Sequence, residues 1–178
     1  MITYYAAHSM DGLLAGPDDE LDWLAGAGKG GEGGDYGYAS FLARQNLVVM
    51  GQRTWSVCDG FPQWPYGTKS CFVLSRAQTG TGRNGERFEA FDPDLWRSRG
   101  LENPVYLVGG GEIARLFLEH DLLDRLVLSA IPVLLGGGRP LFHPGFPKCV
   151  WRLESSAVHP TGVVQSTWMR SPSEGISP

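Results

Sequence analysis

Several features that would assign this chain to a specialised class of protein are scarce or missing. Among 178 residues there are three cysteines, an odd number without C-x-x-C spacing, which argues against a disulfide framework. The four histidines show no metal-ligand spacing. There is no run of eighteen apolar residues, and the N-terminus has neither a basic region nor a long apolar segment. We therefore expect no metal, no membrane partner and a reducing, cytoplasmic compartment.

Excess positive charge is also missing. The formal net charge is -4 and the isoelectric point is near 5.5, and no cluster of Lys and Arg is present to release counterions from a nucleic acid. We therefore expect no nucleic-acid partner. With 42% hydrophobic and 19% charged residues, the chain can bury a core of its own. We predict one domain over residues 1–170 and a disordered tail over residues 171–178.

Apolar segments that suit strands alternate with amphipathic segments that suit helices. We expect strands over residues 2–7, 47–50, 70–74, 105–108 and 125–131, and an antiparallel pair over 149–158 and 163–169. We expect helices after Asp35, over 54–57, from Pro93 to Gly100 and over 112–119, and irregular segments over 9–15, 26–37, 78–86 and 132–147. This order predicts an α/β fold: a mostly parallel sheet with helices on both faces and an antiparallel C-terminal edge. Ligands of such sheets bind outside the carboxyl ends of the strands.

Two of these strand ends are followed by segments that suit a phosphate. The residues from Gly109 to Ala114 match G-x-G-x-x-A between a strand and a helix, where free N–H groups and the helix dipole favour an anion. The alternative is a tight turn that needs a positive φ. Gly51 marks a second junction between a strand and a helix. Here Arg53 is able to pair with a phosphate, and the Thr54 hydroxyl is able to donate a hydrogen bond to it. The alternative for Arg53 is an ordinary surface residue.

Other candidate residues follow from their positions relative to these two turns. Ser75 and Arg76 end the next strand and would suit the 2′-phosphate of NADP. Asp35 follows the glycine-rich segment, and in a partly closed apolar pocket it could orient a substrate amine or relay a proton. It could equally be a helix cap with no catalytic duty. Trp23 could form a wall of the pocket or only anchor the glycine-rich loop, and Cys58 is more consistent with a small buried side chain than with a nucleophile.

Several motifs in order resemble the dihydrofolate-reductase-like superfamily, from Ile2 to about Met169. They are AAHSMDGLLAG, the Asp22–Trp23 pair, VVMGQRTW, FVLSR, VYLVGGGEIARLFL and LVLSAIPVLLGGGRPLF. The last of these is most similar to the reductase domain of bacterial riboflavin biosynthesis, the RibD C-terminal domain, and its stand-alone relatives. The resemblance implies a three-layer fold with a central sheet of about eight strands, NADPH lying across it, and a homodimer.

The resemblance also implies roles for individual residues. It implies that Asp35 and Trp23 contact the substrate, with Asp35 catalytic. It implies a cofactor site made of Ala7, Leu14, Gly51, Arg53, Thr54, Ser75, Arg76, Val108, Gly109, Gly110, Gly111, Glu112 and Ile113. Gln52 stands where a basic residue is common, and Gly67–Lys69 replace the arginine that holds the folate tail, which disfavours folate as the substrate.

Three functions remain open from the sequence. The first is an NADPH-dependent oxidoreductase that transfers hydride to a small heterocyclic or sugar-derived substrate, resembling the 5-amino-6-(5-phosphoribosylamino)uracil reductase of riboflavin biosynthesis. In it, the glycine-rich loop would close and exclude water. The second is a non-catalytic NADP-binding sensor, and the third, less favoured, is a true dihydrofolate reductase.

Overall fold

A computed structural model describes residues 1–24 and 34–171 of the chain, and its centre is a nine-stranded sheet. The strands, in the order in which they lie side by side, are β10 (Trp151–Val158), β11 (Val164–Arg170), β8 (Arg125–Ile131), β1 (Ile2–Ser9), β7 (Val105–Gly109), β3 (Leu47–Gly51), β4 (Ser70–Leu74), β6 (Arg87–Glu89) and β5 (Gly80–Thr81). The six strands from β8 to β6 are parallel, whereas β11, β10 and β5 run antiparallel to their neighbours. The predicted α/β class and the antiparallel C-terminal edge are confirmed.

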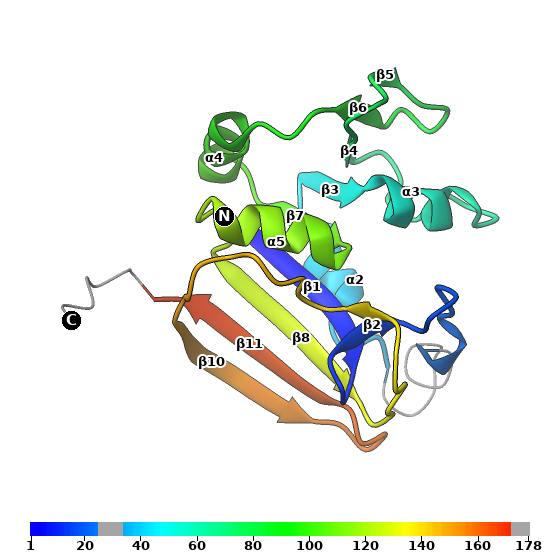
Figure 1. The fold of residues 1–178 in the computed structure, drawn as a ribbon, viewed down its shortest axis with the longest axis vertical. Coiled ribbons are helices and arrows are strands. Elements are labelled where there is room, and N and C mark those ends of the chain that lie inside the picture. Colours follow the sequence, from blue (N-terminus) through cyan, green and yellow to red (C-terminus); the bar gives the residue numbers. More distant parts are fainter. Residues whose placement is uncertain (25–33, 172–178) are drawn as a thin grey trace.

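Helices cover both faces of the sheet (Figure 1). The described residues contain α2 (Tyr38–Ala43), α3 (Gln52–Asp59), α4 (Pro93–Glu102), α5 (Gly111–Glu119) and the 3-10 helix η1 (Asp22–Leu24). All four α-helices lie where the sequence predicts them, although α3 is longer at both ends. Within the described segments, none of the helices has the length and hydrophobicity needed to cross a membrane.

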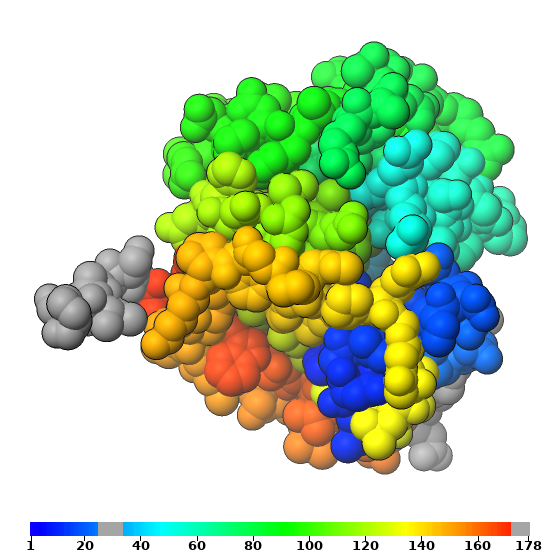
Figure 2. Space-filling view, viewed as in Figure 1, coloured from blue at the N-terminus to red at the C-terminus, as the bar shows by residue number. Residues whose placement is uncertain are grey.

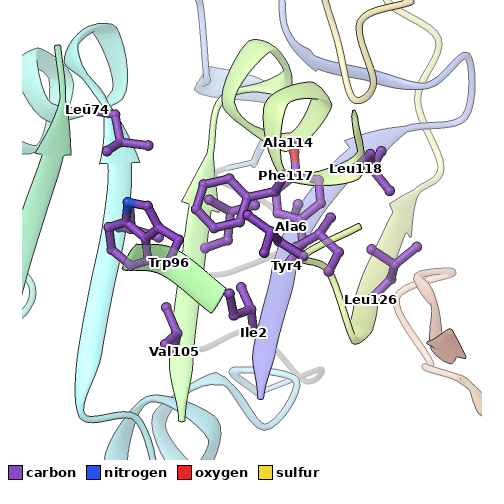
Figure 3. Packing of buried hydrophobic residues seen from close by; sticks show 14 of the residues in the cluster. Ile2, Tyr4, Ala6, Leu74, Trp96, Val105, Ala114, Phe117, Leu118 and Leu126 are labelled. Atoms are coloured by element: carbon purple, nitrogen blue, oxygen red, sulfur yellow. The ribbon is translucent and has the colours of Figure 1, made fainter. Parts of the chain in front are cut away.

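The central strands bury side chains on both faces, which explains why they read as unbroken apolar runs. In β3, Val49 faces the larger core, whereas Val48 and Met50 face the other. The larger core lies under α4 and α5, where Trp96 and Phe117 pack over residues of β1 and β7 (Figure 3). The second core lies under α2 and α3. The three layers are therefore held together by two separate apolar clusters.

The start of α4 agrees with the sequence and its end does not. The Asp92 side chain accepts hydrogen bonds from the backbone N–H groups of Asp94 and Leu95, and Pro93 is the first helical residue. The helix does not stop at Gly100, because that glycine lies against β1. A Cβ there would be 2.8 Å from Cγ1 of Ile2, so Gly100 serves close packing rather than termination.

Four short strands lie in segments predicted to be irregular or in the gaps between predicted elements. Strand β2 (Leu13–Ala15) pairs with β9 (Arg139–Pro140) in a separate two-stranded ribbon, and β5 and β6 extend the sheet by two strands. Their stabilising partners are distant in sequence, and two or three residues show no detectable alternation. Residues 25–33, which include most of the predicted glycine-rich loop, and residues 172–178 of the predicted tail lie outside the described residues.

Candidate functional site

The two glycine turns lie side by side at the carboxyl edge of the sheet. Strands β3 and β7 are parallel neighbours, with Met50 opposite Gly109. A Cβ on Gly51 would lie 2.8 Å from Cγ1 of Ile113 and 3.8 Å from the carbonyl oxygen of Gly109. The start of α3 is therefore in contact with the start of α5, and only a glycine at position 51 permits this approach. The structure thus brings together the two segments that the sequence selects as phosphate-binding turns.

The three glycines at the junction of β7 and α5 serve different purposes. Gly109 has a φ of 115°, a conformation that favours glycine. A Cβ on Gly111 would lie 2.3 Å from the carbonyl oxygen of Pro140, so this glycine lets α5 pack against β9. At Gly110 the backbone is less crowded, since a Cβ there would meet only Oγ1 of Thr54, at 3.7 Å, which is ordinary van der Waals contact. Of the three glycines, Gly110 has the fewest protein atoms near the position of a Cβ.

Helices α3 and α5 begin without a capping side chain. Their N-cap residues, Gly51 and Gly110, provide no side-chain acceptor, whereas α4 is capped by Asp92. The first N–H groups of an uncapped helix remain available to an external acceptor, and the helix dipole favours a negative one. Both uncapped starts lie at the same edge of the sheet. The arrangement can hold two phosphate groups, or one pyrophosphate, without any metal ion.

Charged side chains border the two helix starts. The side chain of Arg53 is 68% exposed, and its Nε lies 3.9 Å from Oδ2 of Asp19. Glu112 is exposed on the first turn of α5. Within residues 1–24 and 34–171, no group of three or more His, Cys, Asp or Glu side chains is placed to hold a metal ion.

At the end of β4, Ser75 has a structural function and Arg76 is exposed. The buried Ser75 hydroxyl donates to Oε1 of Gln52 at 3.3 Å and accepts from the backbone N–H groups of Ala77 and Gln78. This links the end of β4 to the first residue of α3. Arg76 follows in the same turn and is exposed.

Four further predicted site residues belong to four different elements. Ala7 is in β1, opposite Ser129 of β8. Leu14 is in β2 and packs against the larger core. Val108 is partly buried against the second core, on the sheet face opposite to the larger core. Trp23 is in η1, where its indole Nε1 donates to the carbonyl of Glu20 at 3.2 Å. This contact fixes Trp23 within its own segment.

Asp35 lies two residues before Gly37, the N-cap of α2, and its side chain is hydrogen-bonded to the backbone at the start of this helix. Its carboxylate accepts hydrogen bonds from the backbone N–H groups of Ala39 at 2.7 Å and Gly37 at 3.0 Å, and the side chain is exposed. These bonds, first the one from Ala39, lower the pKa of Asp35 below its ordinary value. The expected pocket depends on the glycine-rich loop, of which residues 26–33 lie outside the described residues, so tuning of Asp35 by an apolar pocket stays a prediction. At neutral pH Asp35 is an ionised hydrogen-bond acceptor.

A polar network lies next to Ala7, and the sequence does not predict it. Nε2 of Gln165 lies 3.0 Å from the hydroxyls of Tyr5 and Ser129 and 3.1 Å from the carbonyl of Tyr36. The Tyr5 hydroxyl in turn donates to the carbonyl of Tyr36, the residue after Asp35. The network joins three strands to the start of α2. The only local signal was a buried serine in the apolar strand β8.

Asp11 fixes the turn between β1 and β2 at the same edge of the sheet. Its carboxylate accepts from the Ser9 hydroxyl at 2.5 Å and from the backbone N–H groups of Gly136, at 2.8 Å, and Leu135. These bonds, first the one from Ser9, lower the pKa of Asp11 to about 2. The stabilisation is present above the ordinary pKa of an aspartate and is lost as the pH falls through about 2.

This chain matches a protein-family model and proteins of Bacillus subtilis. The family model of the RibD C-terminal domain matches residues 98–165. The Bacillus subtilis (strain 168) protein YwjB, itself uncharacterized, is 32% identical over 146 residues, which cover 78% of this chain and 80% of YwjB. YyaP from the same organism, also uncharacterized, is 25% identical and covers 89% of each chain.

Solved structures share the fold. A crystal structure from Shewanella sp. PV-4, provisionally named a riboflavin biosynthesis protein, has a TM-score of 0.86 and 29% identity, covering 96% of this chain and 99% of that one. A pyrimidine reductase-like protein from Corynebacterium diphtheriae has a TM-score of 0.67 at 14% identity, covering 96% and 92%. Acinetobacter baumannii RibD has the same TM-score at 15% identity, and this chain spans 57% of its length.

Proposed function

This chain belongs to the RibD C-terminal domain family, within the dihydrofolate-reductase-like superfamily, and from that premise we propose that it is an NADPH-dependent reductase. Its substrate would be a small heterocyclic or sugar-derived compound, similar to the 5-amino-6-(5-phosphoribosylamino)uracil of riboflavin biosynthesis. The family supports an oxidoreductase with a riboflavin-reductase-like fold. The cofactor, the direction of hydride transfer and the substrate are our proposal.

The observation that carries the proposal is the pair of adjacent helix starts without caps. The N-cap residues Gly51 and Gly110 offer no side chain to the first backbone N–H groups of α3 and α5, so these groups can serve an external acceptor. The space in front of Gly110 would be filled by any side chain there. A pyrophosphate fits both features, because it needs several donors and close access to the backbone.

The remaining cofactor-binding residues extend from this centre in two directions. Arg53 and Thr54 would pair with phosphate oxygens, and Arg76 would distinguish NADPH from NADH by pairing with the 2′-phosphate. Ala7 and Leu14 would line the nicotinamide end. Gly109, Gly111 and Ile113 would support the turn through packing. The bound nicotinamide supplies the hydride, and the protein supplies position and exclusion of water.

Asp35 would orient the substrate as an ionised acceptor for an N–H group. We expect Asp35→Asn to lower the turnover number by about tenfold or more and to leave the NADPH dissociation constant unchanged, since the charged acceptor is lost. Asparagine caps helices nearly as well as aspartate, so α2 should remain folded. The matched control is Asp92→Asn, the same change at the cap of α4. Equal turnover in both variants would show that Asp35 only caps the helix.

Titration with NADPH, followed by tryptophan fluorescence, tests the proposal directly. We expect saturable quenching, and consumption of NADPH with at least one acceptor from a panel of aminouracil ribosides, pterins, aldehydes and quinones. Binding without consumption would favour the sensor function, and reduction of dihydrofolate with inhibition by methotrexate would favour a folate reductase. No saturation at near-millimolar NADPH would contradict the proposal.

The proposal includes a cytoplasmic location and association as a homodimer. The free thiols of Cys58, Cys71 and Cys149 suit a reducing compartment. Exposed Leu153 and Val158 on the edge strand β10 offer apolar surface for a second copy. Light scattering across a concentration series measures the association.

A further inference from the structure

An acidic residue links two arginines at the candidate site. Oδ1 of Asp19 accepts from Nε of Arg139 at 2.7 Å, and Oδ2 lies 3.5 Å from Nη2 of the same guanidinium. Oδ2 also lies 3.9 Å from Nε of Arg53. Arg139 belongs to β9 and Arg53 to the first turn of α3, so the carboxylate connects two elements that are far apart in sequence.

This cluster lies next to the start of α5. Pro140, the residue after Arg139, has its carbonyl oxygen against Gly111, which begins α5. The segment that carries Asp19 is packed on β9, since Gly138 lies against the backbone of Ala15 and Gly16. Figure 2 shows these two segments, in blue and yellow, side by side. Arg139 is therefore presented at the edge where both uncapped helices begin.

We propose that Arg139 is a second phosphate-binding arginine and that Asp19 is the internal carboxylate which a ligand phosphate displaces. The ligand class is a phosphate or pyrophosphate group with at least two negative charges. The identification of this group with the phosphates of NADPH rests on the proposed function. Anion binding by the cluster can be measured without it.

The charges of the cluster favour such an exchange. One carboxylate carries a single negative charge and is shared by two guanidinium groups, and it pairs closely only with Arg139. Arg53 is left with a distant contact and a side chain that is 68% exposed. A phosphate group has more negative charge and more acceptor oxygens than a carboxylate, so it can pair with both guanidinium groups at once.

The backbone conformation of Asp19 permits a substitution that changes the charge and not the backbone. Its φ is 64°, in the left-handed region, where asparagine is tolerated about as well as aspartate. Asp19→Asn therefore removes the charge without requiring a new backbone conformation. Asp18→Asn is the matched control, because Asp18 is the adjacent acidic residue and acts on Arg139 through its charge, but makes no ion pair among the described residues. Thermal unfolding verifies that each variant is folded.

Calorimetric titration with inorganic pyrophosphate and, separately, with NADPH tests the exchange. We expect Asp19→Asn to bind pyrophosphate about threefold to fivefold more tightly than the unmodified chain, as expected for losing one exposed competing charge. We expect Arg139→Gln to bind it about tenfold more weakly, and Arg139→Lys to recover part of the loss. In the double variant, the effect of Asp19→Asn should fall below about twofold.

The outcomes separate this inference from the proposed function. If Asp19→Asn binds pyrophosphate no better than Asp18→Asn, Asp19 is not a competitor and the inference is overturned. The same holds if Arg139→Gln matches Arg152→Gln, a control on the exposed edge strand β10. If the expected pyrophosphate effects occur but NADPH does not bind, the anion site stands and the cofactor assignment fails.

Discussion

Replacing Gly110 with alanine is expected to weaken NADPH binding on the order of 100-fold while the thermal unfolding temperature changes little. The added methyl group would cover the backbone of Gly110, which the phosphate must approach. It would exclude one charge-assisted hydrogen bond, worth about 1.5–3 kcal/mol. The methyl group would meet no protein atom closer than Oγ1 of Thr54, at 3.7 Å, which is ordinary contact.

The control for this substitution is Gly60→Ala. Gly60 is the C-cap of α3, at the helix end opposite to the site, with an ordinary φ of -79°. A Cβ there would lie 3.4 Å from the carbonyl oxygen of Val57. We expect unchanged NADPH affinity in this variant. An unchanged dissociation constant in Gly110→Ala as well would show that the cofactor does not approach this turn.

Replacing Trp96 with alanine is expected to lower the free energy of unfolding by about 3–5 kcal/mol. Trp96 is fully buried, and its ring centroid lies 5.6 Å from that of Phe72 and 5.5 Å from that of Phe117. The side chain joins α4 to both β4 and α5 in the larger core. Its loss would leave a cavity beneath the helices that the surrounding rings cannot fill without moving.

Urea denaturation with two comparison variants separates packing from other effects. The indole Nε1 of Trp96 has no hydrogen-bond partner in the described part of the chain, so Trp96→Phe should cost clearly less than Trp96→Ala. Leu101→Ala, on the same helix but 83% exposed, should change the free energy of unfolding by less than about 0.5 kcal/mol. Similar losses for Trp96→Ala and Leu101→Ala would contradict the described core.

The sequence predicts well the strands that bury side chains on both faces and the helices that bury one continuous stripe of apolar side chains. Strands such as β4 and β8 have the predicted boundaries because long apolar runs are set by local composition. The short strands β2 and β9 form only because each supplies hydrogen-bond partners to the other, across more than 120 residues of chain. The local sequence pattern does not indicate which distant segment a short strand pairs with. The sequence therefore predicts a turn in place of β2 and a loop in place of β9.

In the candidate site, too, the sequence predicts the features that follow from local pattern and not those that depend on distant contacts. The turns at Gly51 and Gly109 could be predicted because each follows a strand and begins a helix, and parallel strands place both at one edge. The contact of Asp19 with Arg139 has no local signal, since it depends on how β2 and β9 pair. Asp35 was located correctly at a helix start, but its exposure depends on neighbours that the sequence alone does not place.

Backbone amide chemical shifts, measured while NADPH is added, test the central claim that two adjacent turns hold one coenzyme. We expect the amides at the starts of α3 and α5, near Gln52 and Gly111, to shift together and to saturate at one NADPH per chain. The amide of Gly60, at the far end of α3, should remain unchanged. Shifts confined to one of the two helix starts, or saturable binding that moves neither, would contradict the claim.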